Sequence, residues 1–282
     1  MISAASPEGL SAGAPSLRTL LSRAVPAVMG ILNITPDSFS DAGRFLRPQE
    51  ALAQVRRMIA EGADLIDIGA ESTRPYGAVE VSATEELRRL EPVLPAVVAL
   101  GTPVSIDSMK ASVVDWALHA GAAIANDVWG LQRDPDMAPV IAAHRASVIV
   151  MHNRAEVDPD LDIMQDIAAF FARSLDIASR AGIARDNIVL DPGIGFGKTS
   201  EQSMIVLARQ QELASFGLPI LVGASRKRFI DSVCPSPPHH RLGGSIAAHL
   251  LAMQCGARII RAHDVAETVQ ALRVAAAIRD QQ

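Results

Sequence analysis

The stretch NIVLDPGIGFGKT at residues 187–199 joins a short apolar run, which ends in Asp191, to a loop rich in glycine. Val and Ile favour a β-strand, and Pro192 with the alternating glycines predicts that the strand stops and a loop begins. The ending GKT suggests a P-loop, but that pattern requires a glycine where Pro192 stands. The register therefore excludes a P-loop and indicates a strand followed by a ligand-contacting loop.

The same unit recurs along the chain, because short runs rich in Val and Ile alternate with segments of helical apolar spacing. The clearest helical segments are 49–62 and 163–182. Alternating strands and helices predict a parallel α/β fold, and eight units predict a single (β/α)₈ TIM barrel. A doubly wound open sheet is the alternative. The strand candidates are 27–33, 64–69, 104–107, 123–127, 147–151, 187–191, 219–223 and 257–262.

Composition narrows the class of protein. The chain has 282 residues, of which 49% are hydrophobic, and a net charge of −5, so neither nucleic acid nor an anionic membrane is an expected partner. No apolar run is long enough to span a bilayer. Cys234 and Cys255 lack metal-ligand spacing, which favours a reducing, cytoplasmic location. Residues 1–25 are predicted to be a flexible N-terminal extension, and residues 26–282 a single barrel domain.

Polar side chains end most of the strand candidates. In a barrel the carboxyl ends of the strands and the loops after them form the active-site face. Each such residue alone is more often a helix cap or a loop hydrogen bond, but their convergence on one rim predicts a site there. The residues are Asn33, Asp67, Asp107, Asn126, Asp127, Met151, His152, Asp191, Arg261 and His263.

Two loops carry groups for binding anions. Arg74 follows two hydroxyl residues in DIGAESTRP (67–75), and guanidinium with hydroxyls suits phosphate or carboxylate. Arg261 and His263 point the same way if the strand continues, at the corner where this fold binds anions. A surface ion pair and a structural histidine are the alternatives. Asp264 is expected to cap the following helix.

Other loops carry groups suited to a flat heterocycle. Asp107 can accept from paired N–H donors, and Asn126 can both donate and accept. Phe196 can lie against a ring, and of the basic run 226–228 Lys227 is expected to turn inward. Lys198 is expected to be solvated or close to the start of the next helix.

Taken in order, GILNITPDSFSD, DIGAESTRP, SIDSMK, NDVWGL, MHNR, LDPGIGFGKT, GASRKRFI and RAHDV resemble the dihydropteroate synthase family from residue 27 to about 279. The resemblance implies a transferase of folate synthesis that joins (7,8-dihydropterin-6-yl)methyl diphosphate to 4-aminobenzoate and requires Mg²⁺. It also implies a homodimer and membership of a family that sulfonamides target.

The resemblance also implies roles for individual residues. Asn33 would be the metal contact, and Asp41 would lie in a mobile loop that closes over the reaction. The catalytic set would be Asp41, Arg74, Lys227, Arg261 and His263. The pterin pocket would comprise Asp107, Asn126, Met151, Asp191, Phe196, Gly223, Lys227 and Arg261. The diphosphate site would comprise Asn33, Arg74, Arg261 and His263, and the aminobenzoate site Phe39, Thr73, Pro75 and Ser225.

Three positions depart from the family pattern. Ala70 replaces a frequent glycine, and Ala262 replaces a larger aliphatic residue. Tyr76 is an extra residue beside the expected aminobenzoate site, so sulfonamide sensitivity does not follow from the resemblance. Two rival functions are a barrel that transfers methyl groups from a folate to a corrinoid partner and a silent pterin-binding protein. The methyl-transfer barrel does not need Arg74, Arg261 and His263 to hold a diphosphate, and the intact loops after the first two strand candidates argue against a silent binder.

Overall fold

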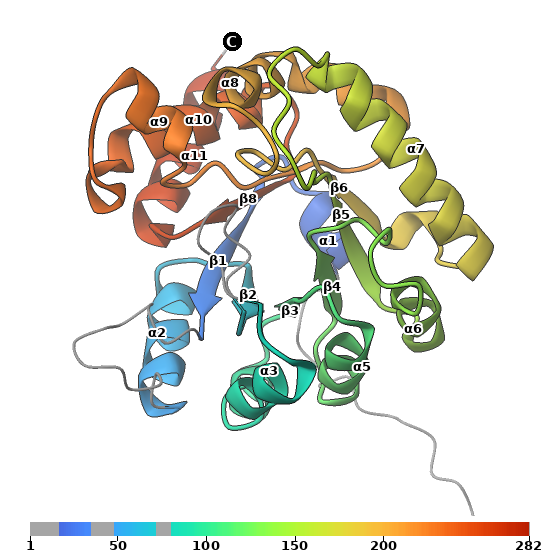
Figure 1. Ribbon diagram of the computed structural model, residues 1–282. Coiled ribbons are helices and arrows are strands. Elements are labelled where there is room, and N and C mark those ends of the chain that lie inside the picture. Colours follow the sequence, from blue (N-terminus) through green and yellow to red (C-terminus); the bar gives the residue numbers. More distant parts are fainter. Residues whose placement is uncertain (1–16, 35–47, 72–79, 282) are drawn as a thin grey trace, which may run out of the picture.

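The computed structural model describes residues 17–34, 48–71 and 80–281. Its eight strands are all parallel and lie in the order β6-β5-β4-β3-β2-β1-β8-β7. A bridge between Leu190 and Ile220 joins β6 to the segment before β7 and closes the ring, which Figure 1 shows from one end. The predicted closed barrel is confirmed, and the open sheet is excluded. The strands are β1 (Ala27–Asn33), β2 (Leu65–Gly69), β3 (Val104–Asp107), β4 (Ile124–Asp127), β5 (Ser147–Met151), β6 (Ile188–Asp191), β7 (Leu221–Val222) and β8 (Ile259–Ala262).

The seventh strand is shorter than the sequence predicts. Only Leu221–Val222 pairs as a strand, although residues 219–223 carry the apolar pattern. Pro219 has no amide N–H to donate, but its carbonyl accepts from the amide of Leu190 at 2.9 Å. Barrel closure on this side therefore relies on a few hydrogen bonds around Ile220.

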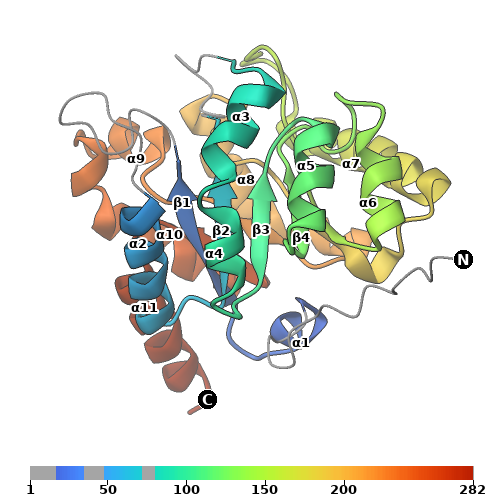
Figure 2. The same cartoon turned by 90° about the horizontal axis from the view of Figure 1, so that it is seen from below.

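Helices surround the ring of strands (Figures 1 and 2). The longest is α7 (Ile163–Ala181). Asp162 precedes it, with a carboxylate that accepts from the amides of Met164 and Gln165, and Gly182 caps its carboxyl end with φ of 84°. The other helices are α2 (Pro48–Ala60), α3 (Ala83–Leu90), α4 (Leu94–Val98), α5 (Ala111–His119), α6 (Met137–His144), α8 (Ser200–Arg209), α9 (Arg228–Val233), α10 (Leu242–Gln254) and α11 (Val265–Arg279), with short 3₁₀ turns at Arg185–Asn187, Gln210–Phe216 and Pro238–His240. Among the described residues, no helix combines the length and apolar character needed to cross a bilayer.

A short helix, α1 (Leu17–Leu21), closes the amino-terminal end of the barrel. Its Leu17 and Leu20 are buried in the same cluster as the inward-facing residues Met29, Leu65 and Ile259 of the strands. Burying one leucine contributes about 2 kcal/mol. Residues 17–25 therefore differ from the flexible extension that the sequence predicts, because two leucines bury against the barrel interior.

Candidate active site

The strand register places four chain positions in one row at the carboxyl ends of β1 to β4. Asn33 pairs with Gly69, Gly69 with Asp107, and Asp107 with Asn126. Farther along the same rim, Met151 pairs with Asp191. The strand ends chosen from the sequence therefore lie on one rim, as expected for a barrel.

Arg261 is the centre of a buried charge network within this rim. Its Nε donates to Oδ2 of Asp67 at 2.7 Å, and its Nη2 donates to Oδ2 of Asp107 at 3.2 Å. Asn126 Nδ2 donates to the same oxygen of Asp67 at 3.1 Å. Asp67 was one of the polar strand ends that predicted a site on this rim, but no binding or catalytic role was predicted for it. Its sequence signal is a lone carboxylate between the apolar residues of β2.

Two carboxylate oxygens of this network have no hydrogen-bond donor among the described residues. They are Oδ1 of Asp67 and Oδ1 of Asp107, and both are buried. An unsatisfied buried acceptor costs about 1–3 kcal/mol. The pair is therefore well suited to accept hydrogen bonds from the N–H groups of a bound molecule.

One guanidinium serves two carboxylates here, and burial changes the protonation of Asp107. Burial raises the pKa of Asp107 to about 8, the negative charge of Asp67 adds to the rise, and Arg261 opposes it. Asp107 therefore holds a proton through neutral pH in the free protein. A ligand that offers N–H donors would favour release of that proton.

Asp191 ends β6 and is fixed by the loop that follows. Its Oδ1 accepts from the amide of Gly193 at 2.7 Å, and Gly193 has φ of 65°. A Cβ atom at position 193 would lie 2.0 Å from the carbonyl oxygen of His152, so only glycine fits. Burial raises the pKa of Asp191 to about 6, while the Gly193 amide, Lys227 and Arg261 lower it. Asp191 and Arg261 thus act on one another within a single site.

Lys227 and Phe196 lie together on the rim, where they place a positive charge beside a flat aromatic ring. The Nζ atom of Lys227 lies 4.0 Å from the centroid of the Phe196 ring, close enough for a cation–π contact. The neighbouring Arg226 instead donates to Asp264 at 3.0 and 2.5 Å. The inward turn of Lys227 is confirmed. Asp264 stands at the N-cap position of α11 as expected, but its side chain makes no cap hydrogen bond and accepts from Arg226 instead.

His263 and Ser225 meet at the edge of the rim, after β8 and β7. Ser225 Oγ lies 3.0 Å from Nδ1 of His263 and accepts from its backbone amide at 3.3 Å. Although the His263 side chain is exposed at the edge, partial desolvation and the cations Arg261 and Arg226 lower its pKa. The imidazole is therefore neutral at neutral pH and can donate one hydrogen bond.

Lys198 was expected to be solvated or close to the start of the next helix. It does lie next to Thr199, the N-cap of α8, but it is not solvated, since only 4% of the residue is exposed. Its Nζ lies 2.6 Å from Nδ1 of His152 and donates to the carbonyls of Gly193 at 2.9 Å and Phe196 at 3.1 Å. Burial lowers the pKa of Lys198 to about 7. The lysine ties the glycine-rich loop to the segment after β5 and so fixes the surroundings of Asp191.

A second lysine, the half-buried Lys110, pairs with two buried glutamates beside the rim. Lys110 Nζ donates to Glu71 at 2.5 Å and to Glu86 at 2.9 Å, and Glu71 also accepts from the amide of Val81 at 3.1 Å. Burial raises the pKa of Glu86, and Lys110 opposes the rise. This cluster joins Glu71 to Val81 and so connects the chain before 72–79 with the chain after it. Sequence reasoning missed it because the three side chains come from separate elements.

Six positions singled out in the sequence lie outside the described residues. They are Phe39, Asp41, Thr73, Arg74, Pro75 and Tyr76.

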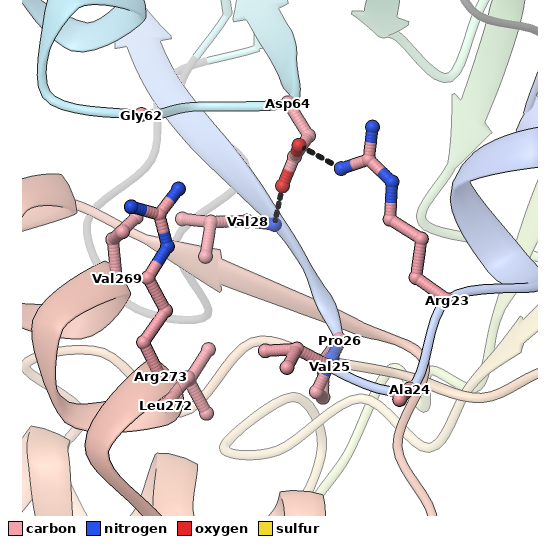
Figure 3. Close-up of a pocket in the computed structure, with 10 residues that line it drawn as sticks. All are labelled: Arg23, Ala24, Val25, Pro26, Val28, Gly62, Asp64, Val269, Leu272 and Arg273. Atoms are coloured by element: carbon pink, nitrogen blue, oxygen red, sulfur yellow. Dashed lines mark hydrogen bonds and ion pairs between the residues drawn. The ribbon is translucent and has the colours of Figure 1, made fainter. Parts of the chain in front are cut away.

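A hollow of about 270 Å³ lies at the other end of the strands and is drawn in Figure 3. There Asp64 precedes β2, accepts from the amide of Val28 at 2.9 Å and forms an ion pair with Arg23. Because this hollow is at the amino-terminal end of β1 and β2, it is separate from the polar rim.

A buried set of acceptors beside basic groups, at the carboxyl rim of a (β/α)₈ barrel, is the arrangement of a pterin-binding enzyme. Residues 29–263 match the family described as pterin binding enzyme. The chain belongs to that family and, within it, to the dihydropteroate synthases.

Three similar proteins illustrate the relationship. The dihydropteroate synthase of Bacillus subtilis is 46% identical over 239 residues, which are 84% of this chain and 83% of the relative. The Clostridium difficile enzyme, solved with pteroic acid, has a TM-score of 0.87 and 46% identity over 90% of this chain and 97% of its own. The Xanthomonas albilineans enzyme, solved with 4-aminobenzoic acid, has a TM-score of 0.87 and 43% identity over 92% of this chain and 94% of its own.

Proposed function

We propose that this chain condenses (7,8-dihydropterin-6-yl)methyl diphosphate with 4-aminobenzoate to give 7,8-dihydropteroate and diphosphate. The observation that carries the proposal is the pair of unsatisfied buried acceptors, Asp67 Oδ1 and Asp107 Oδ1, beside Arg261. The site offers acceptors for a donor-rich ring and a guanidinium for an anion. Related enzymes solved with pteroic acid and with 4-aminobenzoic acid support the same choice of substrates.

The acidic residues of the rim would bind the pterin ring. Asp107 and Asp191 would accept from the adjacent N–H groups of the amino-pyrimidinone edge, and Asn126 would supply a donor and an acceptor. Lys227 would donate to ring acceptors while Phe196 covers the ring face. Met151 and Gly223 complete this part of the rim: Met151 is buried, and a Cβ at Gly223 would be 3.9 Å from Arg261.

The basic residues would hold the diphosphate. Arg261, His263 and Arg74 would donate to its oxygens and disperse the charge of the leaving group, which is electrostatic catalysis. Asn33 ends β1 at the rim, and its amide oxygen is the kind of hard ligand that Mg²⁺ accepts. When bound there, Mg²⁺ would neutralise charge on the diphosphate.

The bond changes need no protein nucleophile. The C–O bond to diphosphate breaks with both electrons leaving on oxygen, and the aniline nitrogen of 4-aminobenzoate then forms the new C–N bond and loses a proton. Ser225, with Phe39, Thr73 and Pro75, would hold the aminobenzoate, and Asp41 would belong to the loop that closes the site. Ser225 already contacts His263, so this serine would join the two substrate sites.

Assay of diphosphate release tests the proposal against its rivals. Purified protein would be mixed with the pterin diphosphate, 4-aminobenzoate and Mg²⁺. Release that depends on aminobenzoate is expected. Tight pterin binding without turnover would instead support the silent binder, and methyl transfer from a folate to a corrinoid protein would support the other rival.

We also propose a cytoplasmic homodimer. Helices α10 and α11 pack together and expose the apolar residues Leu251, Val274 and Ile278, the last two by 54% and 64%. Pairing of two such surfaces would remove them from water. Sedimentation equilibrium should give twice the chain mass, and Val274→Glu should shift the protein towards monomer.

A further inference from the structure

Two histidines and one aspartate meet on the outer helical layer, away from the catalytic rim. Asp115 and His119 lie one turn apart on α5, and His144 is the last residue of the neighbouring α6. Helices of this barrel run antiparallel to the strands, so their final residues lie towards the end opposite the rim. The cluster is therefore separate from the residues proposed to bind substrates.

The distances within the cluster approach those of a metal site. Oδ1 of Asp115 is 2.7 Å from Nε2 of His144 and 3.5 Å from Nδ1 of His119. One potential ligand atom from each residue lies within 4.8 Å of the other two. In a tetrahedral site with bonds of about 2 Å, neighbouring ligand atoms are about 3.3 Å apart. Small side-chain rotations would bring the three groups around one ion.

The packing of the two helices holds the donors together. α5 and α6 contact one another, and the two imidazole rings meet edge to face with centroids 4.4 Å apart. The His144 side chain is only 18% exposed, whereas that of His119 is 69% exposed. The cluster thus has one fixed wall and one side open to solvent, where an ion can enter and keep a water ligand.

We propose that Asp115, His119 and His144 bind a divalent transition-metal ion of the Zn²⁺ type. Two imidazoles and one carboxylate suit Zn²⁺ and Co²⁺, whereas Mg²⁺ prefers oxygen ligands throughout. The ion would link α5 to α6 and stabilise their packing. It would differ in chemistry and position from the Mg²⁺ proposed at Asn33.

Titration of the full-length protein with Co²⁺ tests the proposal, because its visible absorption reports the coordination shell. One equivalent should bind with the d–d bands of tetrahedral nitrogen and oxygen ligation, and Zn²⁺ should displace it. The near-UV charge-transfer band of thiolate ligation should be absent. Zn²⁺ should also raise the unfolding temperature. Mg²⁺ in excess should neither displace Co²⁺ nor raise that temperature to the same extent.

Two variants of the proposed metal ligands and one control variant distinguish this site from other metal-binding side chains of the protein. His144→Gln and the exposed His119→Gln should each weaken Co²⁺ binding by about tenfold or more, a loss reached even by substitutions outside the ligand shell. His240→Gln is the control, because it removes an exposed histidine whose ring neighbour is another histidine, His239. Diphosphate release in Mg²⁺ should be the same in all three variants and in the wild type.

Any one of three results would overturn the proposal. The first is that one equivalent of Co²⁺ does not bind saturably, and the second is a thiolate band that assigns the ion to cysteine. The third is an unchanged Co²⁺ affinity in His119→Gln. The last variant keeps the test decisive even if His144→Gln fails to fold.

Discussion

The guanidinium Nε of Arg261 lies 2.7 Å from Oδ2 of Asp67, although 194 positions separate the two residues in the chain. Strands β8 and β2 are both neighbours of β1, so the side chain of Arg261 reaches across β1 to make this contact. The same guanidinium also donates to Asp107. Arg261 therefore serves two functions: it neutralises buried acids, and it presents a cation to the rim.

Substitution of Arg261 by lysine separates these two functions. Lysine keeps the charge but lacks the planar fork that serves Asp67 and Asp107 together. We expect kcat/KM for the pterin diphosphate to fall about 10²-fold, the scale of losing one preorganised donor, while free pterin binds within a few-fold of wild type. Steady-state kinetics and pterin titration measure the two quantities. Arg279→Lys on α11 is the control. An equal loss in both measurements would show that Arg261 holds the ring or the fold.

Pterin binding should depend on pH through Asp191. The pKa of Asp191 is raised to about 6 by burial, and the proposed contact requires the ionised form. The Asp191 contribution to the affinity for free pterin should therefore be constant above pH 6 and fall towards tenfold per pH unit below it, in addition to the weakening that the Asp107 proton causes below about pH 8. Fluorescence titration between pH 5 and 8 measures this. Asp191→Asn should bind far more weakly. Unchanged affinity in that variant would contradict the assignment.

Asp107 should make the free protein less stable as pH rises. Its pKa is raised to about 8 when folded, whereas an unfolded aspartate titrates near pH 4. Between these values the folded state binds more protons, so the free energy of unfolding falls with pH, by up to about 1.4 kcal/mol per unit. Asp107→Asn lacks this titrating group, so its free energy of unfolding should rise relative to that of the wild type as the pH increases from 5 to 8. Urea unfolding measures it, with the exposed Asp176→Asn as control. A constant difference across this range would show that Asp107 stays ionised.

Lys198 should matter for pterin affinity although it is buried behind the glycine-rich loop. Lys198→Met leaves Nδ1 of His152 and the carbonyls of Gly193 and Phe196 without their donor, which costs about 1–3 kcal/mol. A looser loop should also weaken pterin binding, measured well below the unfolding temperature. Lys110→Met is the matched control, since Lys110 also bridges buried acceptors but contacts Glu71 and Glu86. Equal effects on pterin affinity would exclude a specific role for Lys198.

Helix α1 should contribute stability without affecting catalysis. Leu20 is 1% exposed, and Leu20→Ala is expected to lower the free energy of unfolding by about 2–4 kcal/mol. The kcat value at 25 °C should be unchanged, because α1 closes the end of the barrel opposite the rim. The more exposed Leu21→Ala is the control. A fall in kcat with full folding would connect the two ends of the barrel.

Periodic features were predictable from the sequence, and features made by distant contacts were not. The runs 27–33, 104–107 and 147–151 match the observed strands, because apolar period and flanking turns are local signals. The burial of Lys198 depends on His152, 46 positions away, and no local pattern reports that contact. The local pattern placed Asp264 correctly at the N-cap of α11, but it did not report that the carboxylate would accept from Arg226, 38 positions away, instead of capping the helix.

We expect the arrangement of polar groups across the rim to determine which way a substrate enters. The acidic side chains of Asp67, Asp107 and Asp191 lie buried on the inner side around Arg261, whereas Lys227 and the neutral His263 lie nearer to solvent. A molecule with a donor-rich head and an anionic tail should enter head first, because the buried oxygens accept from its N–H groups and Lys227 attracts its tail. The barrel would then select an orientation before it selects a compound.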